Sequence, residues 1–151
     1  MLHIVLFEPE IPQNTGNIGR LCVGADCALH LIKPLRFRLD DIAVKRAGLD
    51  YWPHLKLHVH EDLDEIYTAF NPERIFLAST KVKTCYWDQR YRDGDVFVFG
   101  PESRGLPESL LQQYPLQGIR IPMSENIRSL NLANSVAVVM FEALRQMRWG
   151  K

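Results

Sequence analysis

The chain has 151 residues, enough for one domain with a hydrophobic core, and 46% apolar with 24% charged residues is ordinary for a globular protein. Its formal net charge is zero, which gives no general attraction to nucleic acid, and its longest apolar run, 136–141, is far too short to span a bilayer. The N-terminal segment lacks the basic region and cleavage site of a signal peptide, so we expect a cytoplasmic protein with no membrane partner.

Strand-like and helix-like segments alternate along the chain. In order, the patterns predict a strand at 2–7, a helix at 15–26, strands at 28–32 and 55–59 with a helix at 40–48 between them, a helix at 62–70, strands at 74–79 and 95–99, a helix at 107–114, a strand at 119–121 and a helix from 130 or 131 to about 147. Thr15 is the expected N-cap of the first helix, and Pro107 the first residue of the fourth. This alternation indicates one α/β domain over residues 1–151, with a mostly parallel sheet and helices on both faces.

The last predicted helix is apolar on more than one face. Leu132, Val136, Val139, Ala143 and Met147 form one apolar face. Val138, Phe141 and Trp149 leave the rest of the surface far from polar. A helix of this kind is buried either in the centre of the core or against a second subunit, and the pattern alone leaves both explanations open.

Three polar loops each follow a predicted strand and precede a predicted helix, at 8–20, 100–107 and 122–131. In an open parallel sheet such loops converge at the carboxyl ends of the strands, where ligands bind. The first loop is Gly-rich but has neither the GxGxxG order of a dinucleotide site nor the ending of a phosphate loop. Glu102 directly follows a buried strand and Pro101, a costly place for a carboxylate unless it meets hydrogen-bond donors. The loops together predict a site for a small polar ligand.

Neither the cysteines nor the histidines have the spacing of a metal site. Cys22, Cys27 and Cys85 form an odd count without paired ligand spacing, and we expect buried thiols. His54, His58 and His60 lie close together in the sequence, but no cysteine or carboxylate pattern completes a zinc site. We therefore expect no metal.

Basic residues occur in small groups although the net charge is zero. Such groups can gather on one face and meet phosphates, or they can simply be solvated, and both explanations stay open for each. The groups are Arg36 with Arg38, Lys45 with Arg46, Lys81 with Lys83, Arg90 with Arg92, and Arg145 with Arg148 and Lys151.

The three loops together resemble the SPOUT superfamily of S-adenosylmethionine-dependent RNA methyltransferases. Its first motif, NxGNxxR, is matched by Asn14, Gly16, Asn17 and Arg20; the second by residues 99–102 with 105–107; the third by 121–122 with 129–132, 134 and 135. The likeness runs over nearly the whole chain. It is strongest to the small single-domain members that methylate the ribose 2′-hydroxyl of the wobble nucleotide, cytidine or uridine 34, in the anticodon region of tRNA.

This resemblance implies a fold, a cofactor and an assembly. The fold would end in a deep C-terminal trefoil knot, and two copies would form a homodimer. The chain carries no added RNA-binding extension, so RNA would be held by the catalytic domain and a partner subunit. S-adenosylmethionine, with S-adenosylhomocysteine as product, would lie in the knot without a metal, against Ala78, Gly100, Gly105, Ile121, Ser129 and Leu130.

The resemblance also implies which residues serve the reaction. Arg20 would contact the ribose or phosphate and assist loss of the 2′-hydroxyl proton, while Glu102 and Asn131 would orient it and the substrate. Asn14 would brace the loop, although Asn14 and Asn131 could also be helix or loop caps. The alternatives are methylation of another tRNA or rRNA ribose, a catalytically silent RNA-binding member of the fold, or a flavodoxin-like nucleotide-binding domain.

Overall fold

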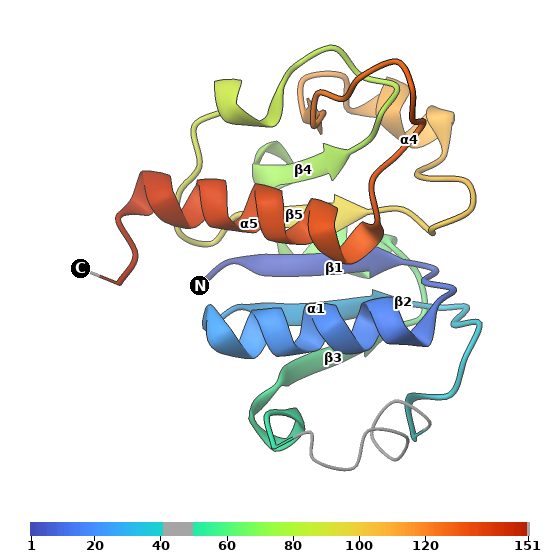
Figure 1. Cartoon of the computed structure of the whole chain (residues 1–151), viewed down its shortest axis with the longest axis vertical. Coiled ribbons are helices and arrows are strands. Elements are labelled where there is room, and N and C mark those ends of the chain that lie inside the picture. The colour runs from blue at the N-terminus through green and yellow to red at the C-terminus, as the bar shows by residue number, and fades with distance from the viewer. Residues whose placement is uncertain (41–49, 151) are drawn as a thin grey trace.

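A six-stranded sheet in which all neighbouring strands are parallel forms the centre of the molecule, in a computed structural model that describes residues 1–40 and 50–150. The strand order is β3-β2-β1-β5-β4-β6. The strands are β1 (His3–Phe7), β2 (Ala28–Ile32), β3 (Lys56–His60), β4 (Ile75–Ala78), β5 (Val96–Phe99) and β6 (Gly118–Ile119). In Figure 1 the arrows point the same way, so the carboxyl ends of the strands share one edge. The predicted parallel sheet is confirmed.

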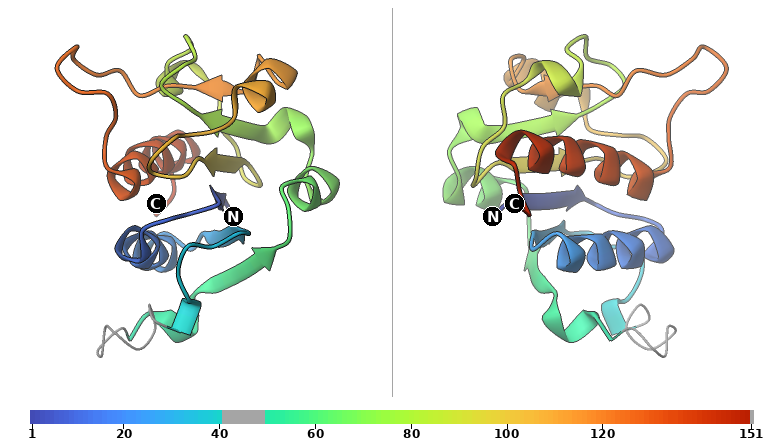
Figure 2. Two further views of the ribbon diagram at one scale, coloured as in Figure 1. Left: turned by 90° about the vertical axis from the view of Figure 1, so that its right-hand side faces the viewer. Right: turned by 60° about the vertical axis from the view of Figure 1, so that its left-hand side comes forward.

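Helices cover both faces of this sheet, as predicted. They are α1 (Pro12–Gly24), α3 (Asp64–Ala69), α4 (Glu108–Gln113) and α5 (Leu132–Met147). Figure 2 shows α1 and α5 side by side on one face, with the shorter helices α3 and α4 on the other. Short 3-10 turns occur at Trp52–His54, Pro72–Arg74 and Tyr86–Asp88. The predicted helix at 40–48 falls almost entirely outside the described residues.

The two faces of the sheet bury two separate cores, because successive side chains of a strand point to opposite sides. In β1, Ile4 and Leu6 join the core beneath α1 and α5, whereas Val5 joins the core beneath α3 and α4. Phe97 is the largest fully buried side chain of the first core, and Ile66 of α3 is fully buried in the second. Near-continuous apolar strands are what a sheet covered on both faces requires.

The first helix begins earlier than predicted. Pro12 is its first residue and Ile11 its N-cap, so the prediction that Thr15 caps this helix is wrong. Thr15 lies fully buried inside α1, and its hydroxyl forms no hydrogen bond with the described residues. A proline suits the first helical position because its missing N–H would be unpaired there anyway. The amides before it find an acceptor in Glu102, far away in the sequence.

Smaller boundary errors occur near the other loops. Pro107 is the N-cap of α4, and the helix itself begins at Glu108. Asn131 caps α5, which begins at Leu132. The strand predicted at 119–121 is only the two-residue β6, because Arg120 pairs with a different segment.

That segment belongs to the connection between β4 and β5. Ala78 pairs with Ile119 on one side of β6. On the opposite side the N–H of Arg120 donates to the Thr84 carbonyl at 2.8 Å, and the N–H of Tyr86 donates to the Arg120 carbonyl at 2.9 Å. The end of β6 therefore lies between β4 and the stretch that follows β4. The trefoil knot itself stays a prediction.

The last helix buries one apolar face and exposes another. Val136, Val139 and Ala143 are completely buried in the first core. Val138 and Phe141 are 37% and 49% exposed on the other side of the helix. The core therefore accounts for one face of α5 only. Among the described residues, no helix is long and apolar enough to cross a membrane.

Candidate functional site

A cavity of about 480 Å³ opens at the carboxyl edge of the sheet. Its walls come from the ends of β4, β5 and β6, the loops that follow β5 and β6, and the start of α5; in Figure 2 the loop between β6 and α5 (orange to red) projects from the body of the protein. The cavity is lined by all the residues expected to bind the cofactor: Ala78, Gly100, Gly105, Ile121, Ser129 and Leu130. Asn14, Glu102 and Asn131 also line it, and Arg20 does not.

The loop after β5 folds tightly back on itself at the cavity wall. A Cβ on Gly100 would lie 2.3 Å from the carbonyl carbon of Gly105, a contact that real side chains do not make. Gly105 has a φ of +68°, and its N–H donates to the Pro101 carbonyl at 2.9 Å. Glycine is needed at 100 for close approach and favoured at 105 for the left-handed backbone. The two glycines keep backbone, rather than side chains, at this wall.

Glu102 ties this loop to the start of α1. Its carboxylate accepts hydrogen bonds from the N–H of Glu10 at 3.1 Å and of Ile11 at 2.5 Å, with the Asn14 Nδ2 at 3.5 Å. The carboxylate therefore meets the donors that its position requires. Both backbone N–H groups lie just before Pro12. Glu102 therefore supplies the acceptor that a local N-cap side chain would otherwise provide.

Asn131 joins the third loop to the same network. Its Oδ1 accepts from the N–H groups of Ala133 at 2.9 Å and Asn134 at 3.2 Å, which caps α5. Its Nδ2 donates to the Asn14 Oδ1 at 3.1 Å. Asn14 is only 6% exposed and contacts Glu102 with its own amide nitrogen. Asn131 is thus both a helix cap and part of a chain of hydrogen bonds that joins all three predicted loops.

A second set of contacts, not predicted from the sequence, closes the outer side of the first two loops. The N–H and Oγ of Ser103 donate to the Glu10 carboxylate at 2.9 and 2.7 Å, and these hydrogen bonds hold the pKa of Glu10 below its usual range. Arg104 pairs with Glu8 at 2.8 Å. The one sequence signal for these contacts is the opposite charge of Glu8 and Arg104. The partners are more than 90 residues apart, so no local pattern predicts that they meet.

Arg20 is set apart from the other predicted site residues. It lies on the exposed face of α1, and its guanidinium carbon is 5.8 Å from the centre of the Tyr51 ring. Since it does not line the cavity, a ligand inside the cavity would not be bound chiefly by this residue. Two other arginines, Arg104 and Arg128, line the cavity itself. Lys81, another lining residue, is paired with Glu108 at 3.2 Å.

The histidines form a hydrogen-bonded row away from the cavity. Nδ1 of His60 lies 2.8 Å from the Glu65 carboxylate, which can only accept, so this nitrogen donates. In neutral rings, His30 Nδ1 then donates to His60 Nε2 at 2.9 Å, and His3 Nδ1 to His30 Nε2 at 3.0 Å. Burial and the neighbouring histidines lower the pKa of His30 to about 3. No group of three or more His, Cys, Asp or Glu side chains in the described part of the chain could hold a metal ion.

The cysteines are free thiols. Cys22 and Cys27 are buried, as predicted, whereas Cys85 is only partly buried. Burial raises the pKa of Cys27 to about 11 and that of Cys22 further. These two thiols are therefore kept in the unreactive protonated form.

Comparison with known proteins places this fold and site among RNA methylases. The SpoU rRNA Methylase family matches residues 1–141 of the chain. A tRNA (cytidine(34)-2'-O)-methyltransferase of Methylovorus glucosotrophus (strain SIP3-4) is 50% identical over 147 residues, covering 97% of this chain and 96% of the relative. One of Escherichia coli (strain K12) is 49% identical over 148 residues, covering 97% and 94%. A solved structure concerned with 2-OH methylation of C/U34 on tRNA has a TM-score of 0.89 and 46% identity, over 97% of this chain and 95% of its own.

Proposed function

The chain belongs to the SpoU rRNA Methylase family, and from this premise we propose that it transfers a methyl group from S-adenosylmethionine to the ribose 2′-hydroxyl of cytidine or uridine 34 of tRNA. The observation that carries the proposal is identity near 50% to tRNA (cytidine(34)-2'-O)-methyltransferases over 97% of the chain. A tRNA-modifying enzyme of this kind would work in the cytoplasm.

The cavity has the properties that the cofactor requires. Its size falls within the range of small-molecule sites, and its walls mix apolar side chains such as Leu106 and Ile119 with backbone groups of the loop at Gly100 and Gly105. We assign cofactor binding to Ala78, Gly100, Gly105, Ile121, Ser129 and Leu130. S-adenosylmethionine supplies an electrophilic methyl group when bound, so the protein's own task is to align and deprotonate the hydroxyl.

The hydrogen-bonded chain from Asn131 through Asn14 to Glu102 is a scaffold for that alignment. All three side chains line the cavity, and each uses polar atoms in hydrogen bonds to another loop. We therefore assign them the placement of the cofactor loops and of the substrate ribose, rather than proton transfer. Small displacements of such a scaffold are costly, because methyl transfer needs the reacting atoms aligned.

Arg20 would act on the RNA. An arginine stays protonated under ordinary conditions, so its simplest role is to hold the ribose or a phosphate and to stabilise negative charge on the 2′-oxygen. The proton would then leave to water or to another group. The position of Arg20 outside the cavity supports a contact with RNA rather than with the cofactor.

We also propose that two copies associate through the exposed apolar face of α5. Val138, Phe141 and nearby Trp149 are 37 to 49% exposed in the single chain. Burying several hundred Å² of such surface would contribute about 25 cal/mol for each Å², before the cost of association. A second copy would also provide more surface for the tRNA.

The test of function is methyl transfer from radiolabelled S-adenosylmethionine to tRNA, followed by mapping of the modified ribose. The expected product is a 2′-O-methyl group at position 34. Methylation at another tRNA or rRNA ribose would retain the chemistry and correct the substrate. Binding of tRNA without any transfer would identify a catalytically silent RNA-binding protein instead.

A further inference from the structure

We propose that Tyr51 is a positioning residue that holds Arg20 in its working orientation, an inference that rests on the proposed function. Tyr51 comes just before the 3-10 turn Trp52–His54, and this segment lies against α1. No sequence pattern connects Tyr51 with Arg20. In the structure the Tyr51 ring lies against the Arg20 guanidinium, and the Tyr51 hydroxyl donates to the helical turn that carries Arg20.

The hydroxyl of Tyr51 fixes the ring to α1. It donates to the carbonyl oxygen of Gly16 at 2.6 Å, and the residue is only 7% exposed. In an α-helix the carbonyl of residue 16 is also the acceptor for the amide of residue 20. The hydroxyl is therefore anchored at the helical turn that carries Arg20, so the ring and the arginine backbone move together.

The face of the same ring supports the guanidinium. The guanidinium carbon of Arg20 is 5.8 Å from the ring centre, within the range of a cation–π interaction. Arg20 forms no ion pair with any described residue, and its side chain is otherwise exposed. A long exposed side chain samples many rotamers, so a supporting ring reduces the conformational entropy that Arg20 must lose when it meets RNA.

Gly19 makes room for this arrangement. A Cβ at Gly19 would lie 3.2 Å from Leu55, 3.6 Å from Trp52 and 3.7 Å from Tyr51. The missing side chain lets the segment at 51–55 approach α1 closely. The ring of Trp52 meets that of Tyr51 edge-on, with centroids 6.4 Å apart, and limits its movement. The platform under Arg20 is thus built from a hydrogen bond, a neighbouring ring and a glycine.

Two substitutions separate the parts of this platform. Tyr51→Phe keeps the ring and removes only the bond to Gly16, whereas Tyr51→Leu removes the ring as well. We expect Tyr51→Leu to lower kcat for tRNA roughly tenfold and Tyr51→Phe roughly twofold, from the strength of cation–π contacts. The affinity for S-adenosylmethionine, measured by calorimetry, should stay unchanged because neither residue lines the cavity.

A double-mutant cycle with Arg20→Ala distinguishes positioning from simple packing. If Tyr51 acts through Arg20, Tyr51→Leu lowers kcat in the wild-type background and not in the Arg20→Ala background. Tyr67→Leu is the matched control, since this partly buried tyrosine lies in the other core and stacks on Tyr114. It should lower Tm, and any effect on kcat should be the same in both backgrounds. An equal fall of kcat for Tyr51→Leu in both backgrounds overturns the proposal.

A spectroscopic measurement tests the contact independently of activity. The Tyr51 ring should shift the NMR signals of the Arg20 Cδ protons upfield, and Tyr51→Leu should abolish that shift. If the wild type fails to methylate tRNA while the ring-current shift is present, the proposed function is wrong and the contact is real. If tRNA is methylated and the shift is absent, the positioning role is wrong and the proposed function stands.

Discussion

The backbone N–H of Ile11 donates to the carboxylate of Glu102 at 2.5 Å, which joins positions 91 residues apart. One residue is the N-cap of α1, and the other belongs to the loop that lines the cavity. The start of a helix and the wall of the site are therefore held by one carboxylate.

Replacing Glu102 should affect stability and activity together. Glu102→Ala leaves the Glu10 and Ile11 N–H groups without their acceptor, and we expect the free energy of unfolding to fall by about 2 kcal/mol. Methyl transfer should fall further, because the loop no longer has a fixed position. Urea denaturation and the methylation assay measure the two effects. The matched control is Glu61→Ala, an exposed carboxylate whose ion-pair partner among the described residues is Lys33, which should cost less than about 0.5 kcal/mol. Equal behaviour of the two variants would contradict the assignment.

Gly100→Ala should abolish cofactor binding. The new methyl group would lie 2.3 Å from the backbone of Gly105, so the loop must open and the cavity wall must move. Titration calorimetry with S-adenosylhomocysteine measures the loss. Gly24→Ala is the control, because a Cβ there meets no atom of the described residues within 4 Å. Unchanged binding by Gly100→Ala would show that the cofactor does not depend on this loop.

Stability should fall in mild acid because of the buried histidine row. Burial lowers the pKa of His30 to about 3 and also lowers that of His3. In the unfolded chain a histidine binds a proton below pH 6.5, whereas folded His30 stays neutral. Protonation of His30 in the unfolded chain therefore leaves the free energy of unfolding unaffected above pH 6.5. Below that pH it lowers this free energy, by about 2 kcal/mol between pH 7 and pH 5. Denaturation curves for His30→Gln should show a smaller pH dependence than those of the wild type.

The loop after β2 should contact tRNA phosphates. Leu35 and Leu39 pack against the core, while Arg36 and Arg38 point outward, and the N–H of Arg36 donates to the Pro9 carbonyl at 3.2 Å. This hydrogen bond places the arginines beside the loop that Glu102 holds. The double variant Arg36→Ala with Arg38→Ala should raise the KM for tRNA without changing cofactor affinity. Each lost contact should also reduce the salt slope by about 0.7 for a single-stranded region.

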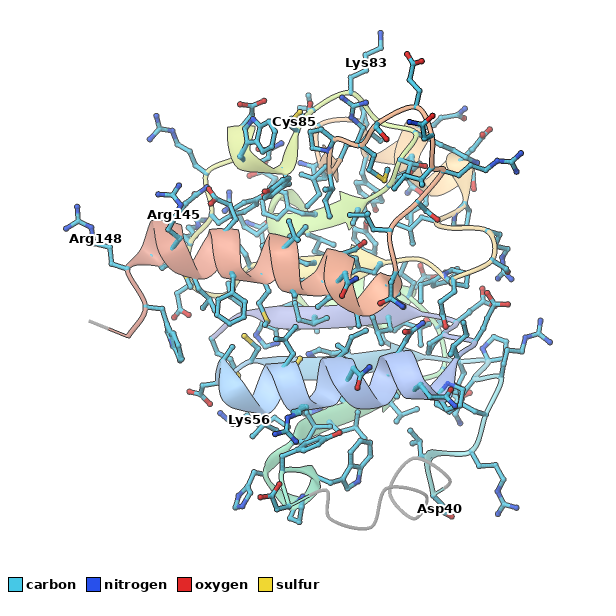
Figure 3. All side chains as sticks on the ribbon, in the orientation of Figure 1. Asp40, Lys56, Lys83, Cys85, Arg145 and Arg148 are labelled. Carbon is cyan, nitrogen blue, oxygen red and sulfur yellow. The ribbon has the colours of Figure 1, made fainter. Side chains whose placement is uncertain are left out.

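Other basic residues provide the comparison for that experiment. Figure 3 shows Arg145 and Arg148 near the C-terminal end of α5, at the other end of the molecule from the carboxyl ends of the strands. Arg145 is already paired with Glu142 at 2.8 Å. Their contact with RNA, like that of Lys81 and Lys83, stays a prediction. A larger effect of replacing Arg145 and Arg148 than of replacing Arg36 and Arg38 would place the RNA along α5.

The dimer should depend on the exposed face of α5. Phe141→Asp puts a charge where we expect an apolar contact, and a monomer should result in sedimentation at micromolar concentration. Far-ultraviolet circular dichroism should be unchanged, since Phe141 is about half exposed in the single chain. Glu142→Ala one residue further on is the control for the helix itself. A wild type that sediments as a monomer would refute the interface.

The sequence predicted the sheet well because each strand is a short apolar run bounded by turn residues. It also located the loops at the cavity, since parallel strands bring their carboxyl ends to one edge. The start of α1 was mispredicted because its cap is Glu102, and no local pattern can reveal an acceptor so distant. The support of Arg20 by Tyr51 was missed for the same reason. Local sequence patterns predict helices and strands, whereas contacts between distant loops are visible only in the folded structure.

Asn131 has a consequence for how the protein responds to its ligand. One side of this residue lines the cavity, and its Oδ1 holds the first amides of α5. The same helix carries the apolar surface around Phe141. Occupancy of the cavity and the proposed association of subunits would therefore share a structural element, and thermodynamic reciprocity requires that any coupling act equally in both directions. Such a coupling would make the assembled fraction of the protein depend on cofactor concentration.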